Sequence, residues 1–156
     1  MTHSASVTIT VGTSTGLTIS GLSVADSANA ADWSLQTNLH VGSVQYGDRT
    51  FTCTAVPAAL TGQQWIRTAN DSKGATANPL VRFTISTSAT VAVAVDSRIG
   101  RRSWMDSSWT DTGTSIRNNE GTPRTFEVFT KTFPAGQVSL GPNGSTTSSM
   151  YMIVVF

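Results

Sequence analysis

Three arginines and two tryptophans lie close together between residues 96 and 111 of this chain. They are Arg98, Arg101, Arg102, Trp104 and Trp109, in a sequence with four tryptophans and only 12% charged residues. An arginine guanidinium matches a carboxylate with two parallel hydrogen bonds. A tryptophan ring offers a flat apolar face against which the C–H face of a sugar can pack. Together these residue types indicate a site that binds an acidic sugar, such as a uronate, rather than a site that breaks a bond.

The same residues have a structural alternative. The arginines could pair with neighbouring aspartates, and both tryptophans could fill the end of a hydrophobic core. The aspartates concerned are Asp96, Asp106 and Asp111. We predict the binding interpretation, with a contact set of Arg98, Arg101, Trp104 and Trp109. The second tier of candidate contact residues is Asp48, Arg49, Trp65, Arg67, Asp71 and Lys73.

The usual catalytic and metal-binding patterns are missing from the sequence. There is no Cys/His cluster for zinc, no phosphate-binding Gly-Lys-Ser/Thr loop and no nucleophile elbow. A glycosidase needs two positioned carboxylates, but aspartates in a loop such as MDSSWTD more often close turns or bind a structural cation. The lone Cys53 reads as a buried, inert thiol. We therefore predict no catalytic activity and no cofactor, with a structural Ca²⁺ left open.

The elements that would position the contact set are strands. Val91, Val93 and Val95 alternate with Ala92 and Ala94, which predicts a strand over residues 90–95 with one bulky and one small face. Further alternating runs are separated by Gly, Asn, Asp and Pro about every eight to twelve residues. These expected strands span residues 33–41, 50–56, 63–69, 80–85, 114–117, 124–133, 137–140 and 150–156. The pattern predicts an all-β fold, an antiparallel β-sandwich of jelly-roll type.

Size and charge limit the remaining possibilities. The 156 residues fit one domain, which we place at residues 23–156, after an N-terminal strand or linker segment at residues 1–22. A net charge of +1 argues against nucleic acid as a partner, and no apolar run is long enough for a membrane span. The composition is typical of secreted bacterial proteins, and the polar start indicates a piece cut from a longer chain.

Three segments carry a resemblance to a known group of proteins. They are YGDRTFTCTAVPAALTGQQWIRTANDSK (Tyr46–Lys73), VAVAVDSRIGRRSWMDSSWTDTG (Val91–Gly113) and FTKTFPAGQVSLGPNG…SMYMIVV (Phe129–Val155). Over roughly residues 32–156 the chain resembles the non-catalytic carbohydrate-binding β-sandwich modules of secreted bacterial polysaccharide-degrading enzymes, notably those of the pectate-lyase type. The resemblance implies a carbohydrate-binding role and an extracellular setting.

From the residues and the resemblance we expect a carbohydrate-binding module. It would hold a covalently linked catalytic domain on a plant cell-wall polysaccharide, either pectic and uronate-containing or another hemicellulosic glycan. The main alternative is a structural or adhesive β-domain of a surface protein or phage fibre. A third option is a small lyase or hydrolase that uses the Arg and Asp residues directly.

Overall fold

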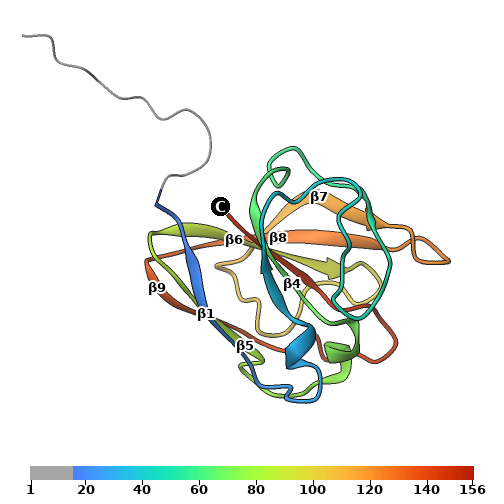
Figure 1. Ribbon diagram of the computed structural model, residues 1–156, viewed down its shortest axis with the longest axis horizontal. Helices are drawn as coiled ribbons and strands as arrows, with labels where there is room; N and C mark the ends of the chain where they lie inside the picture. The colour runs from blue at the N-terminus through green and yellow to red at the C-terminus, as the bar shows by residue number, and fades with distance from the viewer. Residues whose placement is uncertain (1–15) are drawn as a thin grey trace, which may run out of the picture.

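The computed structural model describes residues 16–156, and Figure 1 shows the arrangement of the elements. This part of the chain forms ten β-strands and two short 3₁₀ helices. The strands are β1 (Ile19–Val24), β2 (Ser34–Gln36), β3 (Cys53–Ala55), β4 (Gln64–Arg67), β5 (Val81–Ile85), β6 (Ala89–Asp96), β7 (Thr110–Asn118), β8 (Thr125–Phe133), β9 (Gly136–Leu140) and β10 (Met152–Val155). The 3₁₀ helices are η1 (Ala30–Asp32) and η2 (Asn70–Gly74). No helix among the described residues is long and apolar enough to cross a membrane.

The strands form two antiparallel sheets. The smaller sheet has the order β1-β5-β9, and the larger one has the order β2-β4-β10-β6-β8-β7-β3. The smaller sheet lies to one side of the larger one in Figure 1. The predicted antiparallel β-sandwich is therefore confirmed, with two sheets of very unequal size.

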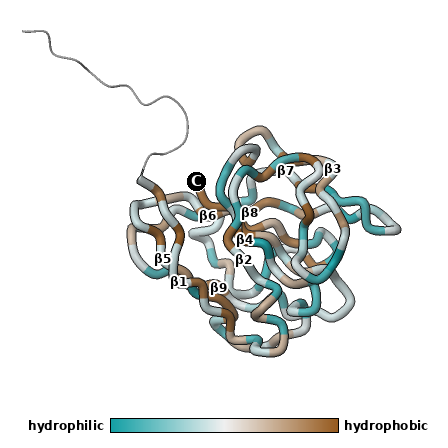
Figure 2. Tube along the Cα trace, in the orientation of Figure 1, coloured by the Kyte–Doolittle hydropathy of each residue, from teal (hydrophilic) through white to brown (hydrophobic). Residues whose placement is uncertain are grey.

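Strand β6 is the centre of the molecule. It pairs with β8 on one side and β10 on the other, so its backbone hydrogen bonds are satisfied along both edges. Val91, Val93 and Val95 belong to the core between the two sheets, and Ala92 and Ala94 belong to a second core on the opposite face of the larger sheet. The predicted division into a bulky and a small face is confirmed, and both faces are buried. The hydrophobic stretches run through the middle of the molecule in Figure 2.

The second core exists because a long connection covers the outer face of the larger sheet. Leu39 from this β2–β3 connection and Leu60 from the β3–β4 connection pack with Trp65, Ala92 and Ala94. Small alanines on β6 leave room for these larger side chains, so the small face predicted from the sequence is the face that receives the covering segment.

The last strand has the position that its composition predicts. β10 lies between β4 and β6, and every residue of Met152–Val155 is buried. An apolar run on both faces is typical of a strand with protein on both sides.

Several boundaries differ from the prediction, among them the start of β7 at Thr110 and the start of β3 at Cys53. The strand expected over residues 33–41 is wrong beyond residue 36, because Asn38 has a φ of 55° and turns the chain out of the sheet. The turn brings Leu39 over the second core, where its N–H donates to the carbonyl of Gln63. At the other end, the domain start expected at residue 23 falls within β1, which pairs with β5 from Ile19 onward. The N-terminal segment before residue 16 lies outside the described residues.

Candidate functional site

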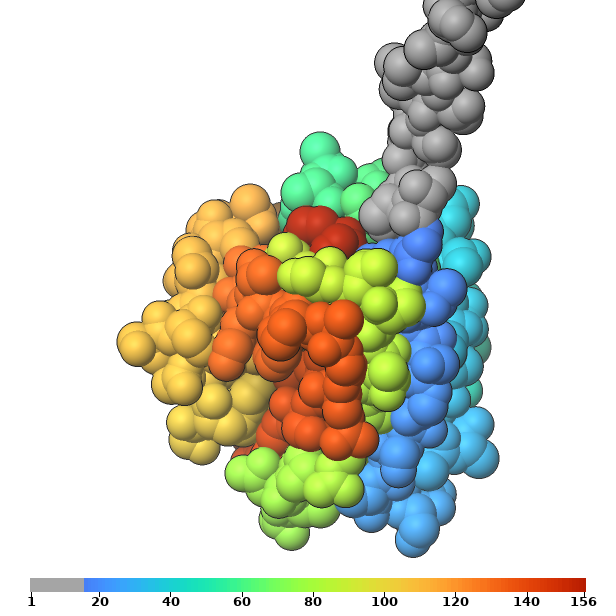
Figure 3. Space-filling view, turned by 90° about the vertical axis from the view of Figure 1, so that its left-hand side faces the viewer, coloured from blue at the N-terminus to red at the C-terminus, as the bar shows by residue number. Residues whose placement is uncertain are grey.

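A cleft of about 350 Å³ opens where the β6–β7 connection meets the edge of the smaller sheet. Its walls come from β5, β8, β9 and the two connections before β5 and β7. The lining residues are Asn78, Pro79, Arg82, Trp104, Trp109, Lys131, Phe133, Ser139, Leu140 and Gly141. Figure 3 views this side of the molecule, where the surface of residues 97–110 (yellow) borders that of β8 and β9 (orange).

Aromatic rings form a continuous series along the cleft. Tyr151, Trp104, Trp109 and Phe133 pack edge to face, with successive ring centroids 6.1, 5.6 and 5.9 Å apart. Edge-to-face packing is a favourable aromatic geometry and fixes the rings relative to one another. Trp109 is only 5% exposed and Trp104 is partly buried, so both belong to the core and also border the cleft. The structural alternative, that both tryptophans fill the core, therefore holds for residues that also line a cleft, and a contact with a ligand stays a prediction.

Trp104 has a fixed orientation. Its indole Nε1–H donates to the carbonyl of Pro142 at 2.8 Å, and its ring lies against Gly141. A Cβ at Gly141 would come within 2.3 Å of the Trp104 ring, so glycine is required for this close approach. The ring is therefore pre-positioned beside the cleft rather than free to rotate.

Arg101 holds the connection that carries both tryptophans. Its guanidinium donates to the carbonyl oxygens of Met105, Asp106 and Trp109 at 2.9–3.3 Å, and it lies 5.2 Å from the centre of the Phe129 ring. These hydrogen bonds use the donors that a ligand would need. In this structure Arg101 positions the loop and does not line the cleft.

Arg98 is committed to a buried carboxylate. Asp96 is fully buried, and Arg98 contacts both of its oxygens, from Nε at 3.0 and 3.2 Å and from Nη2 at 2.5 Å. The backbone N–H of Ser149 donates to the same carboxylate at 2.8 Å. Burial raises the pKa of Asp96, but the hydrogen bonds from Arg98 and from backbone N–H groups outweigh it and hold the pKa below its ordinary value.

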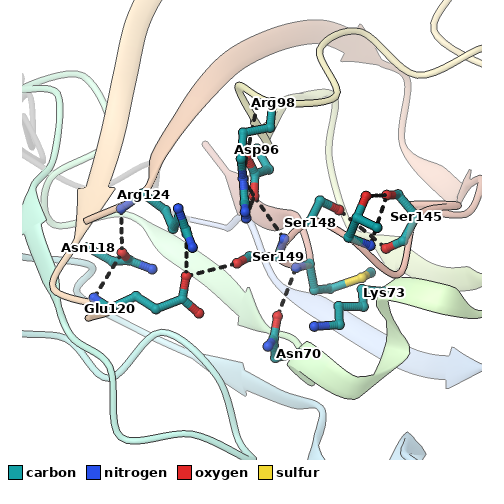
Figure 4. A network of polar contacts seen from close by, with 12 residues as sticks. Asn70, Lys73, Asp96, Arg98, Asn118, Glu120, Arg124, Ser145, Ser148 and Ser149 are labelled. Carbon is teal, nitrogen blue, oxygen red and sulfur yellow. Dashed lines mark hydrogen bonds and ion pairs between the residues drawn. The ribbon is translucent and has the colours of Figure 1, made fainter. Parts of the chain in front are cut away.

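The Asp96–Arg98 pair belongs to a larger polar network, shown in Figure 4. Ser149 Oγ also donates to Glu120 at 3.3 Å, and Glu120 pairs with Arg124 at 2.7 Å. This network ties the end of β6 to the segment that leads into β10. Its residues come from separate parts of the sequence, so the fold rather than the local sequence brings them together.

The second-tier candidates lie in three other surroundings. The carboxylate of Asp48 accepts the backbone N–H groups of Asn70 and Asp71 at the start of η2, and Arg49 bridges Asp48 and Asp71 at 3.3 and 2.6 Å. The carbonyl of Lys73 accepts the N–H of Ser145. None of these residues lines the described cleft.

The remaining second-tier pair faces the other side of the larger sheet. Trp65 is 1% exposed within the second core, and the Arg67 guanidinium lies 5.1 Å from the Trp65 ring centre. Arg67 also donates to the carbonyl of Val44 at 2.9 Å. Both residues are therefore used in packing.

Neither the cysteine nor the loop aspartates form a chemical site in the described residues. Burial raises the pKa of the Cys53 thiol to about 11, against a smaller lowering by Arg67. Asp106 and Asp111 each accept a backbone N–H two residues further on, from Ser108 and Gly113. These are turn-closing contacts. No group of three or more His, Cys, Asp or Glu side chains within residues 16–156 could hold a metal ion.

Two lining residues, Arg82 and Lys131, were missed by sequence reasoning. Arg82 is exposed on β5 and lies opposite Ser139 of β9, whereas Lys131 on β8 shares a face with Phe129 and Phe133. A lysine that alternates with two core phenylalanines was a usable signal, because a charge on the apolar face of a strand needs a polar opening nearby. Arg82 had no comparable signal, since outward-facing arginines are ordinary on a sheet surface.

The comparisons with known proteins concern the fold. No protein-family model and no curated protein matches the chain. Among solved structures the chain is similar to a segment of a β-glucuronidase from glycoside hydrolase family 2, with a TM-score of 0.76 and 21% sequence identity. The match covers 86% of this chain and 14% of that chain. A β-sandwich with this fold therefore also occurs as a small part of a much longer glycoside hydrolase.

Proposed function

We propose that this domain is a non-catalytic carbohydrate-binding module that holds an attached enzyme on a plant cell-wall polysaccharide outside the cell. The observation that carries the proposal is the cleft beside Trp104, which combines aromatic rings with amide, hydroxyl and cationic side chains. Sugars need both kinds of group, since their C–H faces are apolar and their hydroxyls are polar.

The side chains and backbone beside the cleft are held in fixed positions. Trp104 is held by Pro142 and Gly141, and Arg101 fixes the connection around it. Little conformational entropy remains to be lost at these groups when a ligand binds, which favours affinity. The volume of about 350 Å³ is within the range of small-ligand sites and fits a short stretch of sugar rings rather than a long chain.

The chemistry of the lining also favours binding over bond cleavage. Glycoside hydrolysis uses two carboxyl groups about 5–10 Å apart. The residues that line the cleft in the described part of the chain carry amide, hydroxyl, guanidinium and ammonium groups. They supply hydrogen bonds and positive charge, but no pair of carboxyl groups.

The likeness to a glycoside hydrolase supports an attached role. The similar segment makes up 14% of the chain of a β-glucuronidase. A small binding domain tethered to a catalytic domain raises the effective concentration of substrate without any new chemistry. We propose this arrangement for the present domain, with a pectic or hemicellulosic glycan as the polymer.

The test is native affinity electrophoresis through gels that contain polygalacturonate, xylan, xyloglucan or soluble β-glucan. Ser139→Tyr would fill the cleft from an exposed position on β9, and Gln137→Tyr places the same ring two residues away, outside the cleft. We expect at least one polymer to retard the wild type and Gln137→Tyr but not Ser139→Tyr. If no polymer retards the wild type, or if Ser139→Tyr is retarded like the wild type, the proposal is wrong.

A further inference from the structure

We propose that the cleft recognises an anionic sugar and that Arg82 and Lys131 bind its carboxylate. This inference rests on the proposed function and specifies the ligand class of the same site. The residues that we assign to the recognition of acidic sugars are therefore not the arginines near the end of β6. They are two residues from different sheets.

The basic side chains differ in whether their hydrogen-bond donors are used. All 10 lysines and arginines lie in the described residues. Arg49, Arg98 and Arg124 pair with carboxylates. Arg67, Arg101 and Arg102 donate to backbone carbonyls. The remaining basic side chains make no hydrogen bond or ion pair with other described residues, and they are Lys73, Arg82, Arg117 and Lys131.

Two of these four unpaired cations line the same cleft. Arg82 lies exposed on one wall, and Lys131 is partly buried on another, with its ammonium 5.0 Å from the centre of the Phe133 ring. No carboxylate is among the lining residues. The lining therefore carries two positive charges and no negative one, and the Asp106 carboxylate, which lies outside the lining, attracts Lys131 from a distance.

The position of the lysine strengthens the case for an anion. Lys131 lies on the core-facing side of β8 between Phe129 and Phe133 and is partly buried. Its alkyl stem can pack on this apolar surface while the ammonium group reaches the cleft. A carboxylate in the cleft would accept a charge-assisted hydrogen bond from it, which is stronger than a neutral one.

The shape of the site sets the ligand class. Trp104 offers an apolar ring edge or face, and Arg82 can give two parallel hydrogen bonds to a planar carboxylate. A carboxylated pyranose supplies both features in one ring. A neutral sugar satisfies the aromatic group but leaves two cations without a partner, so it is expected to bind more weakly.

The experiment compares one polymer in two chemical forms. Polygalacturonate presents free carboxylates, and its fully methyl-esterified form presents the same backbone without the charge. By titration calorimetry we expect the wild type to bind the free acid about 10-fold or more tightly than the ester, the size of effect that loss of a charged hydrogen bond produces. Affinity for the free acid should also fall as sodium chloride is added.

Two variants and a matched control assign the charge effect. Arg82→Ala and Lys131→Gln should each weaken binding to polygalacturonate about 10-fold. Arg117→Ala removes the same charge from an exposed, unpaired arginine on β7, outside the cleft, and should change binding less than about two-fold. Thermal melting checks that each variant is folded. Arg82→Glu is a second substitution at the same exposed position, and it reverses the charge there.

The outcomes separate the two proposals. Equal affinity for the acid and the ester, or equal loss in Arg82→Ala and Arg117→Ala, would overturn the anionic site. Retardation only in a neutral polymer, abolished by Ser139→Tyr, would preserve the carbohydrate-binding function and overturn the anionic ligand. No binding to any polymer would overturn both.

Discussion

Two pairs of basic side chains in this domain carry the same charge in opposite surroundings. Arg98 and Arg101 have their donors occupied by a buried carboxylate and by loop carbonyls. Arg82 and Lys131 line a cleft and have no hydrogen-bond or ion-pair partner among the described residues. The first pair stabilises the protein, and the second pair has donors free for a ligand.

The two pairs differ in whether the fold places hydrogen-bond acceptors next to their donors. The density of charge along the sequence does not separate them. A cation is available for recognition only where the fold leaves its donors unused. The densest group of arginines therefore lies beside the cleft and supports it, while the proposed ligand contacts come from positions that the sequence spreads over β5 and β8.

The largest effect should come from removing a structural cation. Arg98→Ala leaves the Asp96 carboxylate buried without its side-chain partner, and we expect a loss of about 3 kcal/mol in the free energy of unfolding. Arg82→Ala should change it by less than about 0.5 kcal/mol. Urea denaturation measures both. Equal losses would remove the distinction between structural and ligand-binding cations.

A smaller effect is expected at the support of the aromatic ring. Gly141→Ala places a methyl group against Trp104, and overpacking of this kind costs about 1–3 kcal/mol. It should also weaken polysaccharide binding by displacing the ring. Gly121→Ala is the matched control, because nothing lies within 4 Å of a Cβ there. Tryptophan fluorescence would report the displaced Trp104 ring, and affinity electrophoresis would report the weaker binding. An unchanged fluorescence spectrum would contradict the close contact.

Arg101→Ala should act through the loop. Its guanidinium is exposed at one end, so we expect a loss of only about 1 kcal/mol in stability. Binding should nevertheless weaken, because the connection that carries Trp104 and Trp109 loses its internal hydrogen bonds. Faster hydrogen exchange confined to residues 102–109 would support this role. A variant with wild-type exchange but weaker binding would instead make Arg101 a direct contact.

The smallest effect concerns pH. Burial works against the Asp96 carboxylate, but Arg98 and two backbone N–H groups hold its pKa below the ordinary value. Its contribution to stability is therefore complete above the unfolded pKa of about 4 and is lost as the pH falls through the lower folded pKa. Thermal melts from pH 6 to pH 2 should show this decline in the wild type. In Arg98→Ala the folded pKa of Asp96 rises toward or above the unfolded value, so the decline should be smaller or absent, and identical profiles would contradict the pairing.

The sequence by itself determined the scaffold. Alternating valines and alanines define a strand with two different buried faces, and the apolar run at residues 152–155 defines a central strand. These features are local, since side chains alternate across a strand whatever its neighbours are. The sequence also located Trp104 and Trp109 beside the cleft, because few other segments combine aromatic and polar residues in this density.

Only the tertiary structure decided which charges are free. The partner of Asp96 at Ser149 is 53 residues away, and the cleft joins side chains from β5, β8, β9 and the β6–β7 connection. Arg82 on β5, the middle strand of the smaller sheet, and Lys131 on β8 of the larger sheet line the same cleft because the two sheets pack together there. Pairing depends on distances between segments that are remote in sequence, and such distances are set by the packing of the sheets and not by any local pattern.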